Sequence, residues 1–141
     1  MVAPLVETFT LRTRAEQDEP EDLVATVELQ AARGDGWVKI AADWIDREVG
    51  DLTPTFPDEE LAAAIGRAHE LGVRVAAHVF GEEALPGLIA AGIDSIEHGT
   101  GITGSVIDAI AGKGIAVVPT LVNIDTFPQI AAQGEGKFPR Y

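Results

Sequence analysis

Residues 68–78 read Ala-His-Glu-Leu-Gly-Val-Arg-Val-Ala-Ala-His, a stretch that ends one helical pattern and begins a strand. Gly72 suits the left-handed residue that commonly closes a helix. The run after it is short, rich in valine and alanine, and stops at His78. Short apolar runs of this kind are typical of strands that are covered by helices. The stretch therefore predicts a helix, a tight turn and a buried strand.

The same order of elements recurs along the chain, which is a weak internal repeat. Helical patterns also end at Gly34, Gly92 and Gly114, and each is followed by another short apolar run. The predicted helices span residues 21–33, 58–71, 82–91 and 105–113, and the predicted strands span residues 37–40, 73–78, 93–98 and 115–120. Pro86 must delay or kink the third of these helices, because proline disrupts a helix interior.

Strands that alternate with helices predict right-handed crossovers and a parallel α/β sheet. A complete (βα)₈ barrel needs about 250 residues, and this chain has 141. We therefore expect a partial TIM-like barrel of about four parallel βα units, or else a small open doubly wound sheet. The expected boundaries are an N-terminal loop or extra strand over 1–17, the partial barrel over 18–122, and a loop or C-terminal tail over 123–141.

The amino-acid composition limits which kinds of molecule the protein is expected to bind. The net charge is −13, and the chain has 46% hydrophobic residues and no cysteine. Such acidity argues against nucleic acid and anionic membranes. No apolar run reaches the length of a membrane span, and the N-terminal stretch does not resemble a signal peptide. Without cysteine neither disulfides nor thiolate metal sites can form, so we expect a cytoplasmic protein.

Three residues with metal-ligating chemistry end successive predicted strands. Alternation places Val38 and Ile40 on one face of their strand and Lys39 on the other. A desolvated lysine loses its proton more readily, and its neutral amine can add carbon dioxide to give a carbamate that bridges two cations. The alternatives are a lysine that snorkels to the rim, forms a Schiff base or binds phosphate.

His78 falls on the same face as Lys39 by alternation, and His98 ends the next strand before a glycine. Neutral imidazole is the commonest side-chain metal ligand. A single such histidine is more often a hydrogen-bonded core residue, but two on successive strands beside an inward lysine favour a metal site. His69 lies in a helix and is interpreted as structural, favoured there by the helix dipole.

Carboxylates near these strands are the remaining candidates. Glu97 is expected to be a partner of a ligand or to form an inter-strand ion pair. Asp43 and Asp46 follow the Lys39 strand and are interpreted first as loop residues at the mouth of the barrel.

At these residues the chain resembles the amidohydrolase superfamily, most of all its imidazolonepropionase-like and prolidase-like branch. The resemblance covers residues 18–122, the fourth to seventh barrel units of the family. It is carried by four stretches, residues 37–40, 68–78, 91–100 (AGIDSIEHGT) and 114–120 (GIAVVPT).

The resemblance implies that Lys39 is a carboxylated lysine bridging two metal ions, usually zinc, and that His78 and His98 are metal ligands. Other divalent metals would also serve. It implies a hydrolase of amide C–N bonds, with dipeptides, N-acyl amino acids or cyclic amides as substrates. Metal ions in such enzymes activate a hydroxide and polarise the scissile carbonyl.

The chain also departs from the family pattern. No histidine precedes His69, so the His-x-His pair of the first strand is missing, and Asp125 comes too early for the catalytic aspartate of the eighth strand. That aspartate supplies general acid–base help typically worth about 10²–10⁴-fold. The chain alone is expected to form an incomplete catalytic domain.

Four parallel strands without closure leave two edges and an inner face open. We expect this face to present Trp37, Ala76 and Ile96, and to be covered by a missing barrel half or by a second copy of the chain.

Three functions stay open from the sequence. The first is a metal-dependent amidohydrolase, and the second is a non-catalytic half-barrel that acts as a binding or assembly module. The third is a doubly wound domain whose Lys39 binds phosphate or forms a Schiff base, although no glycine-rich phosphate loop is present.

Overall fold

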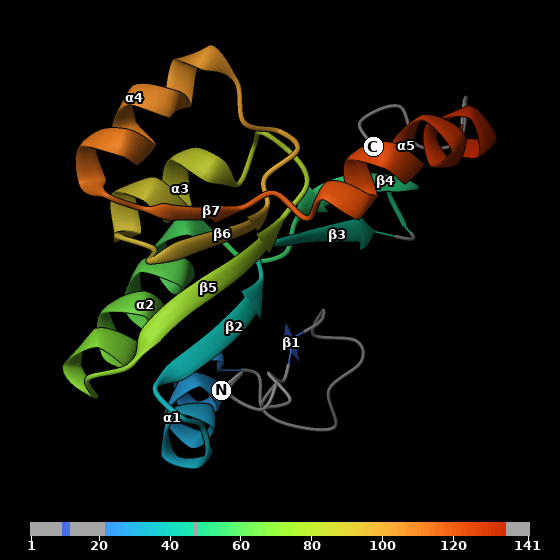
Figure 1. Cartoon of the computed structure of the whole chain (residues 1–141). Coiled ribbons are helices and arrows are strands. Elements are labelled where there is room, and N and C mark those ends of the chain that lie inside the picture. Colours follow the sequence, from blue (N-terminus) through green and yellow to red (C-terminus); the bar gives the residue numbers. More distant parts are fainter. Residues whose placement is uncertain (1–9, 12–21, 47, 135–141) are drawn as a thin grey trace, which may run out of the picture.

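A parallel sheet forms the centre of the computed structural model, which describes residues 10–11, 22–46 and 48–134. The sheet has five strands in the order β1-β2-β5-β6-β7, and every neighbouring pair is parallel (Figure 1). Its strands are β1 (Thr10–Leu11), β2 (Trp37–Ala41), β5 (Arg74–Val79), β6 (Ser95–His98) and β7 (Ala116–Val118). The predicted partial TIM-like barrel is confirmed.

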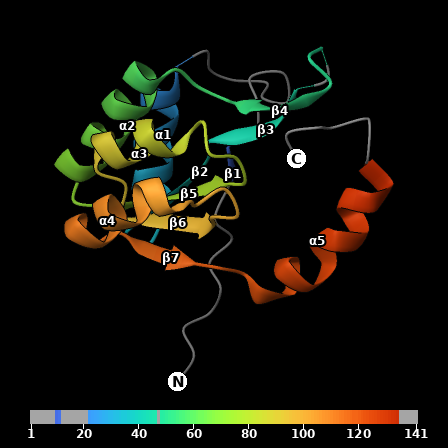
Figure 2. The same cartoon turned by 90° about the horizontal axis from the view of Figure 1, so that it is seen from above.

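Four helices alternate with these strands and lie on the same side of the sheet (Figure 2). They are α1 (Leu23–Arg33), α2 (Asp58–Glu70), α3 (Leu85–Ala91) and α4 (Gly104–Lys113). Asp22 caps α1 by accepting hydrogen bonds from the N–H groups of Val24 and Ala25. Pro86 lies in the first turn of α3, where a missing N–H costs little, so this helix starts late. None of the described helices combines the length and hydrophobicity of a membrane span.

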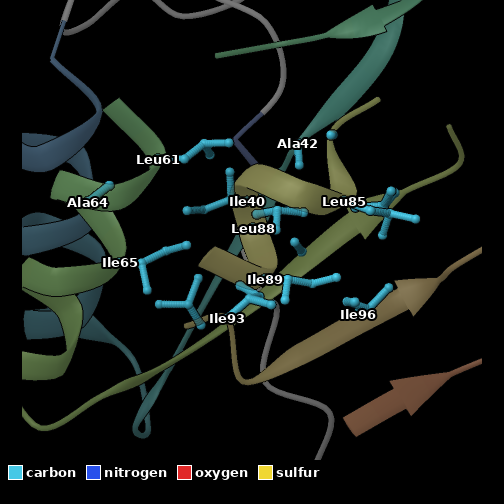
Figure 3. Packing of buried hydrophobic residues seen from close by; sticks show 14 of the residues in the cluster. Ile40, Ala42, Leu61, Ala64, Ile65, Leu85, Leu88, Ile89, Ile93 and Ile96 are labelled. Carbon is cyan, nitrogen blue, oxygen red and sulfur yellow. The ribbon is translucent and has the colours of Figure 1, made fainter. Parts of the chain in front are cut away.

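The hydrophobic core lies between the sheet and these helices (Figure 3). Ile40 of β2 and Ile96 of β6 are fully buried there, together with Leu61 and Ile65 of α2 and Leu88 of α3. Burial of each such side chain stabilises the fold by about 1.5–3 kcal/mol. The alternation predicted for β2 is confirmed, because Val38 and Ile40 face the helices.

The opposite face of the sheet would be the inner face of a barrel. Register places Lys39 beside Ala76 and Ala76 beside Ser95, so these three side chains share that face. The expectation that Ile96 also lies there was wrong. Because β6 alternates from Ser95, the inner positions belong to Ser95 and Glu97, and Ile96 packs among the helices.

A β-hairpin follows β2 where only a loop was expected. It pairs β3 (Asp43–Asp46) with the antiparallel strand β4 (Asp51–Pro54). The carboxylate of Asp46 starts its turn by accepting hydrogen bonds from the N–H groups of Glu48, at 2.7 Å, and Val49, at 3.2 Å. Asp43 and Asp46 are therefore strand residues, and the hairpin extends beyond the carboxyl end of β2 (Figure 1).

The expected tail over 123–141 was wrong for its first part, because α5 spans Leu121–Gly134. Pro128 lies inside this helix. The segment was interpreted as a loop because it is rich in proline and glycine. In its first turns the Asn123 N–H donates to the carbonyl of Thr120 at 2.7 Å, and the Thr126 hydroxyl donates to the carbonyl of Val122 at 2.9 Å. Residues 135–141 lie outside the described residues, as does most of the segment 1–17, of which Thr10–Leu11 forms the extra strand β1.

Candidate metal centre

Lys39, His78 and His98 gather at the carboxyl ends of three adjacent strands. His78 pairs with Ala41 in the sheet register. Lys39 precedes Ala41 by two residues on the same strand, so its side chain lies on the same face of the sheet as His78, further from the carboxyl end of the strands. His98 pairs with Val79, and simple alternation would turn its side chain toward the helices. Its backbone instead has φ 70°. Non-glycine residues rarely adopt such left-handed backbone, and they cluster at functional sites.

The left-handed backbone of His98 brings its ring to that of His78. The two ring centroids lie 4.8 Å apart at an interplanar angle of 74°. Sequence reasoning placed these histidines on successive strands, and the structure brings them into contact.

Two side chains from the segment after β7 contact the Nδ1 atom of His98. It lies 2.9 Å from Thr120 Oγ1 and 3.1 Å from Asn123 Nδ2. Thr120 donates its hydroxyl to the carbonyl of Val118 at 3.4 Å, so its oxygen can accept a hydrogen bond from Nδ1–H. In that tautomer Nε2 keeps its lone pair for a metal. The Asn123 side-chain nitrogen can only donate, so Nδ1 accepts a hydrogen bond from it only in the opposite tautomer. No pattern in the sequence pointed to Thr120 and Asn123 as partners of a ligand.

The amine of Lys39 lies 3.4 Å from the Glu97 carboxylate, and the two side chains are only 20% and 22% exposed. The expected inter-strand ion pair is thus present, reaching across β5 on the inner face. Burial lowers the pKa of His98, and the Lys39 charge lowers it further, while Glu97 acts in the opposite direction. The result favours neutral imidazole, which is the form that ligates metals.

Asp43 is a buried carboxylate at the same site, although the sequence suggested an exposed loop residue. It is 1% exposed and lies 3.9 Å from His78 Nε2. The N–H groups of Phe80 and Gly81 donate to its Oδ2 at 2.9 and 2.6 Å. Burial raises the pKa of Asp43 to about 6, against the lowering effect of these two hydrogen bonds. Asp43 therefore fixes the turn that follows His78.

Aromatic rings surround the two histidines. The ring of Trp44 lies 5.0 Å from that of His78, and the ring of Phe80 lies 4.3 Å from His78 and 5.1 Å from His98. Phe127 of α5 packs edge-on against Phe80 at 5.4 Å. Rings at this spacing lower the local dielectric and strengthen any charge interaction at the site.

His69 lies at the other end of the sheet strands. Its Nε2 lies 2.8 Å from the carboxylate of Asp94, which also accepts a hydrogen bond from the N–H of Val75. His69 therefore ties the end of α2 to the start of β5 and β6. This position agrees with its interpretation as a structural residue.

The donor chemistry fits one side of a metal site. Two imidazoles converge, and a lysine lies on the same face. Within residues 10–11, 22–46 and 48–134, however, no three side chains of the His, Cys, Asp and Glu types are grouped to hold a metal.

Several known proteins are similar to this chain. No family model matches the chain. Ochratoxinase from Aspergillus niger is 31% identical over 121 residues, which is 84% of this chain and 25% of the ochratoxinase. Its crystal structure superposes with a TM-score of 0.68 at 29% identity, over 80% of this chain and 26% of that one. A Xaa-Pro dipeptidase with methionine bound in its active site gives a TM-score of 0.64 at 29% identity, over 81% and 28% of the two chains.

The chain belongs to the amidohydrolase superfamily. A relative in Mycobacterium tuberculosis, an uncharacterized protein, is 55% identical over 126 residues, which is 89% of this chain and 34% of the relative. The chain thus spans between a quarter and about a third of the length of the curated relatives that it matches. It matches a central portion of the amidohydrolase barrel, as the sequence predicted.

Proposed function

We propose that the protein is a metal-dependent hydrolase of amide C–N bonds, and that Lys39, His78 and His98 form one side of its metal site. The observation that carries this proposal is the meeting of the two imidazoles, with ring centroids 4.8 Å apart, at the carboxyl end of a parallel sheet. In parallel α/β folds this edge is where ligands and catalytic groups gather. The superfamily of the chain supports the same reaction class.

Each residue has a distinct part in the proposal. His78 and His98 would bind the metal as neutral imidazoles, with His98 oriented by Thr120. Lys39 would leave Glu97, lose one proton to become a neutral amine, and add carbon dioxide with release of a second proton to water, which would give an anionic carbamate able to ligate a metal through oxygen. Zinc is the expected metal, as a pair of ions with the remaining ligands from outside this chain, and such ions polarise carbonyls and activate water.

The expected substrates are small amides or peptides, such as dipeptides, N-acyl amino acids or cyclic amides. Similar proteins support this class, since one is a dipeptidase with bound methionine and another is a prolidase solved with N-methylphosphonate-L-proline. A cytoplasmic location is part of the proposal and follows from the composition of the sequence.

The alternative function is a half-barrel that serves as a binding or assembly module. Among the described residues, the edge strand β7 favours it, because Val117 and Val118 are 39% and 45% exposed. A missing barrel half or a second copy would cover such an edge.

Metal analysis of three histidine variants tests the proposed function. We expect near-stoichiometric zinc in the protein and loss of most of it in His78→Ala and His98→Ala, since each removes a ligand. His69→Ala is the matched control and should keep its zinc, because His69 contacts Asp94 away from the site. The readouts are zinc content after dialysis and hydrolysis of a panel of N-acyl amino acids. Absence of bound metal across the pH range would refute the metal site and favour the assembly module.

A further inference from the structure

A cavity of about 510 Å³ opens beside His98. Its walls come from three parts of the chain, the loop after β6, the end of β7 and the first half of α5. The lining residues that matter here are His98, Thr100, Val117, Ile124, Phe127 and Pro128. Small-molecule sites usually fall between about 300 and 1,000 Å³, so the cavity has the size of a ligand pocket.

The chemistry of the lining is mainly apolar. Val117, Ile124, Phe127 and Pro128 form most of the wall, and His98 is the only titratable side chain among the lining residues. A charged group placed there would lose its hydration without gaining an ion pair, which is unfavourable. An apolar group would instead gain by leaving water.

Contacts with the candidate metal centre hold the wall formed by α5. Asn123 lies 3.1 Å from His98 Nδ1, and the Phe127 ring packs on Phe80, which in turn packs on both histidines. The position of the pocket is therefore fixed relative to His98. A substrate whose reacting carbonyl lies at the histidines would place a neighbouring side group in this pocket.

We propose that this pocket binds the apolar side group next to the scissile C–N bond, and that the substrates are N-acyl amino acids or dipeptides with a leucine- or phenylalanine-sized residue. This inference rests on the proposed function. Burial of a side chain of that size corresponds to a preference of about ten- to a hundredfold in kcat/KM over glycine. Acidic side groups should be disfavoured still more.

A matched pair of variants on α5 tests the pocket. Ile124 lines it and is 52% exposed, whereas Ile130 is 40% exposed on the same helix and is not a lining residue. Ile124→Asp should lower kcat/KM for N-acetyl-L-phenylalanine, relative to kcat/KM for N-acetylglycine, by at least about tenfold. Ile130→Asp should change neither substrate. Equal kinetics of Ile124→Asp and Ile130→Asp on both substrates would overturn the inference and leave the proposed hydrolase intact.

Direct binding separates this inference from the proposed function. Removal of the metal prevents turnover, so calorimetry on the metal-free protein can measure binding of N-acetyl-L-phenylalanine alone. We expect this binding to be abolished in Ile124→Asp and retained in Ile130→Asp. If no amide is hydrolysed but this binding pattern holds, the pocket stands and the hydrolase fails. If Ile124→Asp lowers the melting temperature while binding and selectivity stay unchanged, a protein segment fills the pocket and the inference is wrong.

Discussion

Asp43→Ala is expected to lower the free energy of unfolding by about 2–4 kcal/mol relative to Asp43→Asn at neutral pH. The carboxylate of Asp43 is the acceptor for the N–H groups of Phe80 and Gly81, and alanine would leave both of these partly buried donors without it. Each unmet buried donor costs about 1–3 kcal/mol. The Phe80 N–H is shared between Oδ1 at 3.0 Å and Oδ2 at 2.9 Å, and the Gly81 N–H donates to Oδ2. Asparagine can therefore still accept from both N–H groups when its carbonyl oxygen takes the place of Oδ2.

Urea unfolding of the two variants measures this difference in the free energy of unfolding.

The substitution also affects the candidate metal centre, because the turn held by Asp43 follows His78 directly. The N–H of Ala42 donates to the carbonyl of His78 at 3.0 Å. We therefore expect Asp43→Ala to bind zinc more weakly than Asp43→Asn. Equal stability of the two variants would show that the hydrogen bonds of Asp43 contribute little.

The raised pKa of Asp43 adds a pH dependence to the same comparison in the metal-free protein. The pKa rises from 3.8 to about 6 on folding, so the folded state binds this proton more tightly. The resulting stability is fully present below pH 3.8 and is lost as the pH rises through about 6. Each pKa unit corresponds to about 1.4 kcal/mol.

Wild type should therefore gain about 2 kcal/mol relative to Asp43→Asn when the pH falls from about 7.5 to about 4.5. Chemical unfolding of both proteins across this range checks the sign, and the other carboxylates cancel because both proteins contain them. A difference that is constant with pH would contradict burial of this carboxylate in its ionised form.

Gly101→Ala is the second substitution with a large expected effect, about 2–3 kcal/mol of destabilisation. A Cβ at this position would overlap the backbone of Gly81 and Glu82, and backbone cannot move aside as a flexible side chain can. The loop after β6 and the loop after β5 lie together here. Thr100 donates to the carbonyl of Phe80, and Gly99 donates to that of Val79, both at 3.0 Å.

Separation of these loops would also disturb the candidate metal centre, because one follows His98 and the other follows His78. Thermal unfolding measures the loss of stability, and zinc content measures the effect on the site. Gly104→Ala is the control, since a Cβ at Gly104, three residues further on, meets no atom within 4 Å. Similar melting temperatures for the two variants would show that the loop contact is looser than the structure indicates.

Local patterns in the sequence were sufficient for the main elements. Periodicity, glycine at helix ends and short apolar runs predicted α1 to α4 and strands β2, β5, β6 and β7 to within a few residues. These signals are local because a strand covered by helices must be apolar and a helix must end on a residue that tolerates the turn. The prediction failed at the hairpin β3–β4 and at α5, where composition resembled a loop.

The order of strands along a parallel sheet also made part of the site predictable. Residues that end successive strands meet at one edge, so Lys39, His78 and His98 could be grouped before the fold was known. Glu97 was expected as a partner of a ligand, whereas the roles of Thr120, Asn123 and Asp43 were not, because their contacts with the histidines join segments far apart in the chain.

The sequence by itself determined the parallel α/β class, the superfamily and the placement of three candidate ligands at one edge of the sheet. Only the tertiary structure decided that His98 turns inward, that Asp43 is buried beside His78, and that α5 forms a pocket beside His98. The physical reason is that burial, a left-handed backbone and a pKa shift depend on contacts between segments far apart in the chain. Strand and helix patterns, in contrast, arise from neighbouring residues.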